Sequence, residues 1–155
     1  MKNSLEISLK TVHLGSAKRV TTLGINQQDQ ANDYLLKLGK SNIQGFQSIL
    51  KRLQVIAEHD SFENKRTYRH VGNQVFEVKT TTGLRLYTFP DTIDGQAHQL
   101  IIAICGGKKG NKKEQQADIT KAKQIKKAYL AAKKLATTQL TIIRLPDEPD
   151  DPDEN

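Results

Sequence analysis

Apolar and polar residues alternate at the start of the chain. Leu5, Ile7 and Leu9 are separated by polar positions, and this period of two is typical of a strand with one buried face. A second, weaker strand is predicted over residues 18–22. The first part of the chain is therefore expected to contribute strands rather than helices.

Helical spacing replaces this alternation near residue 28. One side of the first predicted helix is apolar, at Ala31, Tyr34, Leu35 and Leu38. We expect this helix over residues 28–38, with Gly39 as the residue that ends it. Ser41 or Asn42 then caps a longer helix, whose apolar face continues from 43 to 57. Two helices so close in sequence predict an antiparallel helical hairpin.

The middle of the chain predicts strands again. The segment VFEVKTTTGLRLYTF is typical of a hairpin, with a tight turn over 80–83 and a second strand over 84–89 that Pro90 ends. The continuous apolar run over 99–105 predicts a strand in the middle of a sheet, because a strand buried on both faces has no polar alternation. Gly106 and Gly107 are expected to end this strand.

The last predicted elements are a helix over 116–136, reached through a lysine-rich loop, and an edge strand over 139–145. This order of elements predicts an α+β fold in which an antiparallel sheet packs against helices on one side. We expect a single domain over residues 1–146, and an acidic disordered tail over 147–155, where proline and dense acid disfavour packing.

The net charge of the chain is +7, but the acids are unevenly distributed. Six of them lie in the predicted tail: Asp147, Glu148, Asp150, Asp151, Asp153 and Glu154. Without these six, 11 acids face 24 lysines and arginines, so residues 1–146 carry +13. A field of this sign attracts phosphate polymers and raises their rate of encounter. RNA is the polyanion that we expect.

Lysine is concentrated late in the chain. Ten lysines lie between Lys108 and Lys134, against two acids, Glu114 and Asp118. Such a cluster favours a binding surface over evenly spread charge. The alternative, that the surplus only keeps the protein in solution, stays open at this point.

The sequence indicates neither a membrane protein nor a disulfide. No stretch reaches the roughly 18 to 20 apolar residues of a membrane span, and the start MKNSLEISLK lacks the apolar region of a signal peptide. Cys105 is the only cysteine and lies in the run LIIAIC, so we expect a buried apolar residue rather than a nucleophile. We expect a cytoplasmic protein with no membrane partner and no cofactor.

Two segments resemble the RelE/HigB superfamily of toxins from bacterial toxin-antitoxin modules. The first is the hairpin VFEVKTTTGLRLYTF, with a basic residue on each strand, and the second is LIIAICGGKKGNKKEQQADITKAKQIKKAYL. The resemblance covers the core of the predicted domain, about residues 28–135. It implies a RelE-like fold with an N-terminal helical hairpin and a C-terminal lysine-rich helix. It also implies ribosome-dependent cleavage of mRNA, with mRNA, the ribosome and a cognate antitoxin protein as partners.

Metal-independent cleavage of RNA through its own 2′-hydroxyl needs a base, a cation for the crowded phosphate and an acid. By resemblance, Lys79 is the base and Arg85 grips the phosphate, for which its planar guanidinium is suited. Lys109 lies near a further family arginine and matches by charge only. Several family nucleases carry a catalytic tyrosine or histidine near the C-terminus, and this chain has no clear match, which leaves cleavage less supported than binding.

Further basic residues are expected to bind RNA around these three. They are Lys65, Arg66, Arg69, His70, Lys108, Lys112 and Lys113. The nuclease hypothesis requires Lys79, Arg85 and the lysines of 108–113 to meet on one concave face of the sheet. Each of them can also be an ordinary solvated surface charge.

Two alternatives remain beside the nuclease. A protein of the same fold can bind nucleic acid without cutting it, or can inhibit gyrase as the ParE-like members of the superfamily do. The acidic tail can fold over the basic surface as a phosphate mimic at high effective concentration, or can simply keep the chain in solution.

Overall fold

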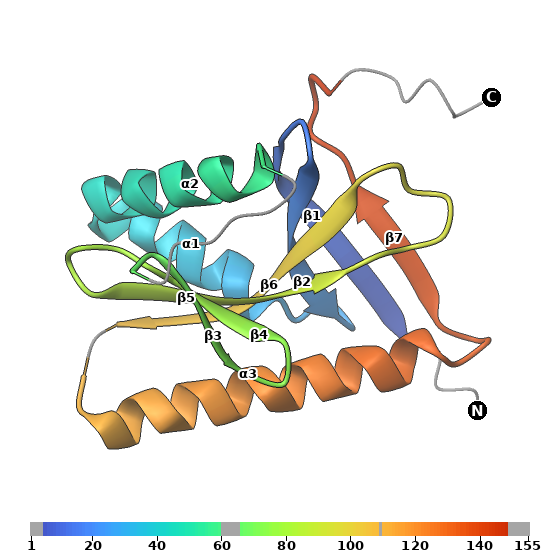
Figure 1. Ribbon diagram of the computed structural model, residues 1–155. Helices are drawn as coiled ribbons and strands as arrows, with labels where there is room; N and C mark the ends of the chain where they lie inside the picture. The colour runs from blue at the N-terminus through green and yellow to red at the C-terminus, as the bar shows by residue number, and fades with distance from the viewer. Residues whose placement is uncertain (1–4, 60–65, 109, 149–155) are drawn as a thin grey trace.

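In residues 5–59, 66–108 and 110–148, which the computed structural model describes, seven strands form one sheet and three helices pack against it (Figure 1). The elements are β1 (Glu6–Leu14), β2 (Lys18–Ile25), α1 (Gln30–Ser41), α2 (Ile43–Ala57), β3 (Tyr68–Gly72), β4 (Val75–Lys79), β5 (Leu84–Asp91), β6 (Gln99–Lys108), α3 (Lys112–Lys133) and β7 (Gln139–Ile143). The α+β class predicted from the sequence is confirmed.

The sheet has the strand order β3-β4-β5-β6-β2-β1-β7 and is mixed. Strand β2 runs parallel to β6, and β7 runs parallel to β1, whereas the other neighbours are antiparallel. The expectation of an antiparallel sheet is therefore wrong. Parallel neighbours cannot be joined by a tight hairpin: α1, α2 and β3–β5 separate β2 from β6, and all the other elements separate β1 from β7.

Helices cover both faces of the sheet, not one face as expected. Figure 1 shows α1 and α2 on one side and α3 along the other. Alternate residues of the same strands enter the two cores: Leu86 and Ile101 lie on the α1–α2 side, whereas Phe89 and Ile102 lie on the α3 side. Strands buried on both faces explain why residues 99–105 form a continuous apolar run.

The N-terminal strands are more central than their sequence indicates. Strands β1 and β2 were both predicted, and in β2 every residue except the last is buried. Arg19, Thr21 and Thr22 are among these buried positions. The polar residues of β2 therefore belong to a strand inside the sheet, although polar residues usually indicate an exposed one. Asn42 alone separates α1 from α2 and caps α2, with its Oδ1 accepting from Gly45 N at 2.9 Å.

Gly106 and Gly107 continue β6 instead of ending it. The lack of a side chain at each position lets a side chain from a helix approach the strand. A Cβ on Gly106 would lie 2.3 Å from the Tyr34 ring on α1. A Cβ on Gly107 would lie 2.6 Å from the Asp118 carboxylate on α3. The pair therefore serves close packing on both faces of the sheet rather than a turn.

Two elements differ from the prediction near the basic segments. Strand β3 was not predicted, and it is the edge strand that leads into β4 through a turn at Asn73 and Gln74, both with positive φ (53° and 60°). Helix α3 begins at Lys112 rather than at 116, because Asn111 Oδ1 accepts from Glu114 N at 2.8 Å and caps it. Part of the expected lysine-rich loop is helix.

Candidate nucleic-acid interface

Lys79 and Arg85 lie opposite each other on β4 and β5. Residues directly opposite in an antiparallel pair point to the same face of the sheet. Arg85 alternates with Leu84 and Leu86, which belong to the α1–α2 core, so Lys79 and Arg85 start on the α3 face. The structure brings together these two residues that the resemblance singled out.

Arg85 is engaged in a buried ion pair. Its Nη1 donates to Glu77 Oε2 at 2.7 Å, and the side chains of Glu77 and Arg85 are 0% and 11% exposed. Arg69 Nη2 lies 3.6 Å from the other carboxylate oxygen of Glu77. A carboxylate held between two guanidinium groups cancels much of their charge, so Arg85 is not free to attract phosphate from solution.

Helix α3 covers the face on which Arg85 lies. Gln115 Nε2 donates to Glu77 Oε2 at 3.3 Å, and Asp118 lies above Gly107. Burial raises the pKa of Asp118, so this carboxyl also sits in partly desolvated surroundings. The open concave face that the nuclease hypothesis requires is therefore occupied by α3.

The lysines of residues 108–113 do not all join Arg85. Lys108 pairs with Leu84, whose side chain enters the α1–α2 core, so Lys108 starts on the opposite face from Arg85. Lys112 and Lys113 are exposed on the first turn of α3. Lys65 and Lys109 lie outside the described residues. We expected all these groups to meet on one face. The strand register shows that this expectation is wrong for Lys108.

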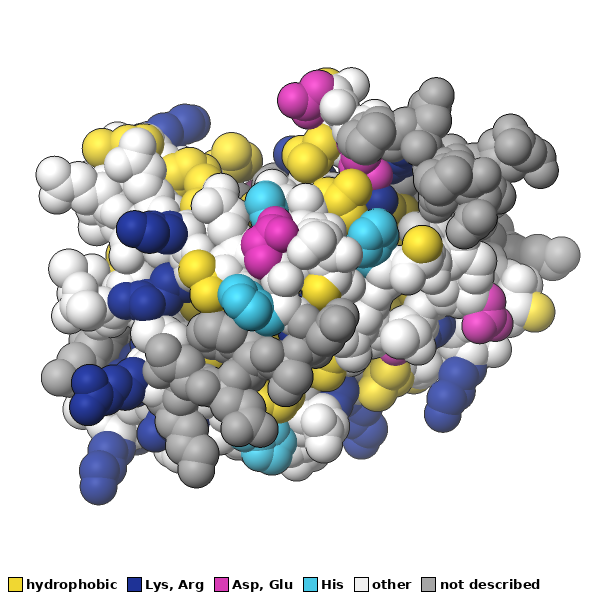
Figure 2. All heavy atoms as spheres, turned by 45° about the horizontal axis from the view of Figure 1, so that its top comes forward, with side chains coloured by type: hydrophobic (Ala, Val, Ile, Leu, Met, Phe, Trp, Pro, Cys, Tyr) yellow, Lys and Arg dark blue, Asp and Glu magenta, His cyan; other side chains and the backbone are white. Residues whose placement is uncertain are grey.

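The other expected RNA-binding residues divide between the two faces. Arg69 is 44% exposed and lies on the α3 side, beside the first turns of the helix. His70 packs against Phe76, with 5.1 Å between ring centroids, and its Nε2 accepts from Gln74 N at 3.3 Å. Arg66 is exposed before β3. Seen from the α1–α2 side, the visible basic side chains lie mainly around the margin of the molecule (Figure 2).

A basic groove lies between α3 and the turn that joins β3 to β4. Its volume is about 580 Å³, and it is lined by Asn73, Thr120, Lys123, Gln124, Lys126, Lys127, Leu130, Ala131 and Lys134. Four of these nine residues are lysines. We call this feature the α3 groove.

The turn between β3 and β4 is held against α3 by Lys126. Its Nζ donates to the carbonyl oxygen of Asn73 and lies 5.7 Å from the centroid of the Phe89 ring. Burial lowers the pKa of Lys126. Lys123 approaches the same turn, since a Cβ on Gly72 would lie 2.9 Å from its Nζ. Lys126 therefore supports the groove, while its neighbours supply the more accessible charge.

The accessible lysines of the α3 groove follow the helical repeat. Lys123 and Lys134 of the groove are spaced by eleven residues, or about three turns. The exposed Lys112, outside the groove, lies eleven residues before Lys123, so the three share one side of the helix over about 33 Å. Lys127 lies one turn after Lys123. Within the described part of the chain, no acid forms an ion pair with Lys123, Lys127 or Lys134. Helical spacing of the lysines was the signal in the sequence that could have revealed this stripe.

One acid of the predicted tail is part of the fold. Glu148 accepts from Arg19 Nη1 at 2.9 Å and from Arg144 Nε at 3.1 Å, and its side chain is 2% exposed. The hydrogen bond from Arg19 is the main reason that the pKa of Glu148 falls to about 2. The ordered part of the chain thus extends into the predicted tail, whose residues 149–155 lie outside the described residues.

Other candidate groups are structural. Burial raises the pKa of Cys105 to about 12, which keeps its thiol neutral. Tyr129 is buried and donates to Asp91 Oδ2 at 2.6 Å, as expected for a core residue. Among the described residues no cluster of His, Cys, Asp or Glu could hold a metal ion, and no helix has the length and apolarity needed to cross a membrane.

No family model, curated protein or solved structure matches this chain. The geometry of the chain itself is therefore the basis for a functional proposal. That geometry offers two arrangements of basic groups on the α3 side: the covered Lys79 and Arg85 pair, and the accessible stripe along α3.

Proposed function

We propose that the protein binds a single strand of nucleic acid, RNA in the first place, along the α3 groove. The observation that carries the proposal is the lining of this groove by Lys123, Lys126, Lys127 and Lys134. A row of lysines binds the phosphates of a nucleic-acid strand favourably, because the counterions condensed on the strand are released into solution. The row runs along a helix, whose backbone is already ordered. The entropic cost of binding on the protein side is therefore mainly the ordering of the lysine side chains.

The groove suits a strand with exposed bases better than a simple anion. Leu130 is 36% exposed and lies in the groove with the side chains of Thr120 and Gln124. Proteins that bind single strands commonly stack bases on aromatic side chains beside the cations, and in this groove Leu130 is the apolar surface that a base can contact instead. These features favour single-stranded RNA or DNA over a small phosphate.

The test compares two triple variants with the same change in net charge. One replaces Lys123, Lys127 and Lys134 by Gln, and the control replaces the exposed Lys37, Lys40 and Lys51 of α1 and α2 by Gln. Binding of a labelled single-stranded RNA is measured by fluorescence anisotropy at several salt concentrations. Each lost phosphate contact lowers the slope of log affinity against log salt by about 0.7, so the groove variant should lose about 2.

Equal losses in the two variants would reject the groove, because net charge alone would then explain the binding. Absence of binding by the unaltered protein at low salt would reject the proposal as a whole. Single-stranded DNA of the same sequence, measured in parallel, shows whether the 2′-hydroxyl contributes.

A second candidate function is the cleavage of mRNA on the ribosome by a RelE/HigB-like toxin. The observation that favours it is the direct pairing of Lys79 with Arg85 on neighbouring strands. In this function the start of α3 moves away from Arg85, which exchanges Glu77 for the scissile phosphate once ribosome-bound mRNA is present. Lys79 takes the proton from the 2′-hydroxyl, the 2′-oxygen displaces the 5′-oxygen from phosphorus, and water gives a proton to that leaving oxygen. The partner that restrains it is an antitoxin encoded beside it.

Ribosomes programmed with mRNA test this second candidate. Cut message should appear with the unaltered protein and should be lost in Lys79→Ala, whose side chain is partly exposed and dispensable for the core. Message that stays intact with the unaltered protein rejects cleavage. Inhibition of gyrase in the same preparation would instead favour the ParE-like alternative.

A further inference from the structure

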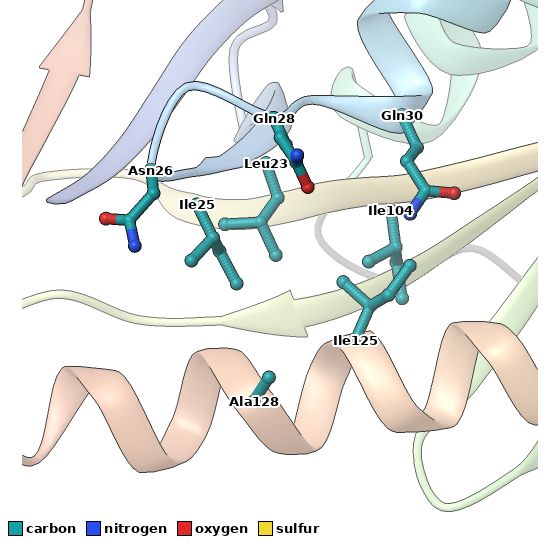
Figure 3. Close-up of a pocket in the computed structure, with 8 residues that line it drawn as sticks. All are labelled: Leu23, Ile25, Asn26, Gln28, Gln30, Ile104, Ile125 and Ala128. Carbon is teal, nitrogen blue, oxygen red and sulfur yellow. The ribbon is translucent and has the colours of Figure 1, made fainter. Parts of the chain in front are cut away.

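A second pocket lies on the other side of α3 from the α3 groove. Ile125 and Ala128 line it from the helix, and the sheet contributes Leu23 and Ile104 (Figure 3). Ile125 is two residues from both Lys123 and Lys127, which turns it about 200° away from them around the helix. The two sites therefore open on opposite sides of the same helix.

The size of this pocket suits a small ligand. Its volume is about 370 Å³, which lies in the range of about 300 to 1,000 Å³ common for small-molecule sites. Figure 3 shows Ile125 facing Ile104, with Leu23 and Ile25 continuing the apolar surface of the sheet. Leu23 and Ile104 are only 2% and 1% exposed, so a ligand would contact mainly the partly buried Ile25 and Ile125 at the mouth of the pocket.

No charged side chain lines the pocket, although the chain carries a net charge of +7. Its polar groups are the carboxamides of Asn26, Gln28 and Gln30. Among the described residues none hydrogen-bonds the side chain of Gln28 or Gln30, and Figure 3 shows both pointing toward the apolar surface. The lining thus offers neutral donors and acceptors at one side of an apolar slot.

The rim of the pocket is held in place before any ligand arrives. Ile25 and Gln28 exchange two backbone hydrogen bonds of 3.0 and 3.1 Å, and between them Asn26 and Gln27 have positive φ (49° and 71°). Asn26 Oδ1 also accepts from Glu6 N at 2.9 Å, which leaves its amide nitrogen as a donor. A backbone fixed in this way lowers the cost of ordering the rim on binding.

We propose that this pocket binds a nucleobase, with adenine as the preferred base. Glutamine and asparagine carboxamides can donate to N7 and accept from the 6-amino group of adenine in one plane. Ile25 and Ile125 offer the apolar contact to the ring, and the lack of charge leaves the phosphate outside. The base can come from a free nucleotide or from a nucleic-acid strand, and the chemistry of recognition is the same.

The test follows the methyl groups of the isoleucines by NMR in the full chain. Adenosine should shift the signals of Ile25, Ile104 and Ile125 in a saturable way, whereas ribose 5-phosphate, which lacks a base, should not. Ala128→Phe fills the pocket from an exposed helix position and should abolish these shifts. Ala117→Phe, also exposed on α3 but outside both sites, is the matched control and should keep them.

A hydrogen-bonding role is tested separately from pocket filling. Gln28→Ala and Gln30→Ala together should weaken adenosine binding by about tenfold, since two hydrogen bonds of ordinary strength are lost. An unchanged affinity would show that the carboxamides do not recognise the base. Absence of saturable shifts with adenosine, or equal shifts in Ala128→Phe, overturns the proposal.

The source of the base is decided by an oligonucleotide. If a strand supplies it, an adenine-rich single strand should shift the same methyl groups and an abasic strand should not, while free adenosine binds more weakly. If a nucleotide supplies it, adenosine monophosphate should bind and the strand should leave the signals unchanged. The triple Gln variant of Lys123, Lys127 and Lys134 should still bind adenosine, so failure of the α3 groove does not imply failure of the pocket.

Discussion

Basic side chains on the α3 side of the sheet fall into two regions with opposite surroundings. Near the start of α3, Arg85 is buried and Glu77 neutralises it at 2.7 Å. Further along the same helix, Lys123 and Lys127 face a groove and form no ion pair with any described acid. The difference teaches that a cation becomes a candidate for binding phosphate only when the fold leaves it accessible and without an acidic neighbour.

The largest expected effect concerns the buried region. Glu77→Ala leaves Arg85 covered by α3 without its carboxylate, and removing one partner of a buried pair costs about 3 to 5 kcal/mol. Chemical denaturation at neutral pH measures the loss in the free energy of unfolding. Glu6→Ala, at an exposed position on β1, is the control and should change stability by less than about 0.5 kcal/mol. Equal effects in the two variants would mean that the ion pair contributes nothing.

A second prediction concerns Glu148, whose carboxylate is also buried and paired with an arginine. The pKa of Glu148 is lowered from 4.5 to about 2, so its ion pair stabilises the fold above pH 4.5 and the stabilisation is lost as the pH falls toward 2. Glu148→Gln should remove about 2 to 3 kcal/mol at pH 7. The difference between variant and unaltered protein should shrink below pH 4.5 in urea unfolding. A difference that stays constant from pH 7 to pH 2 would contradict the assigned cause.

The third prediction concerns the N-terminal cap of α3, the helix that covers Arg85. Asn111 caps the helix, and Asn111→Ala should cost about 1 kcal/mol because the amide of Glu114 loses its acceptor. Gln116→Ala, exposed inside the same helix, should have little effect on thermal unfolding. If the two variants unfold at the same temperature, the early start of α3 does not depend on this cap.

The smallest expected effect is on the salt dependence of RNA binding, which should differ between the groove and the buried pair. Lys123→Gln should lower the salt slope of RNA binding by about 0.7. Replacing the buried pair by Glu77→Leu with Arg85→Met should leave that slope unchanged, because a buried pair can be exchanged for apolar residues without loss of the fold. A reduced slope in the double variant would show that Arg85 reaches phosphate after all.

Elements with a simple hydrophobic period could be predicted from the sequence. The alternation of Leu5, Ile7 and Leu9 predicted β1, and the helical spacing of apolar residues predicted α1 and α2. Ser41 or Asn42 was expected to cap α2, and Asn42 does so. Strand β3 was missed because an edge strand of polar residues has no distinct period. The length of β6 was missed because glycine there serves close approach and not a turn.

The candidate site was predicted less completely than the fold. The density of lysine between 108 and 134 indicated a basic surface, and Lys112, Lys123 and Lys134 do share one side of α3. The ion pair between Arg85 and Glu77 was not predicted, although Glu77 lies in the same hairpin. Lys108 lies opposite Leu84 because of the β5–β6 register, which the sequence does not reveal. A shift of one residue would have turned Lys108 to the other face of the sheet.

The sequence by itself determined the class of elements, the apolar strand β6 and the excess of positive charge, since each follows from local period or composition. Only the tertiary structure decided which cations are accessible. Lys126 meets Asn73 across 53 residues of sequence, and Arg19 meets Glu148 across 129. Contacts over such separations depend on strand order and on the face that each helix covers, and neither is encoded in a local pattern.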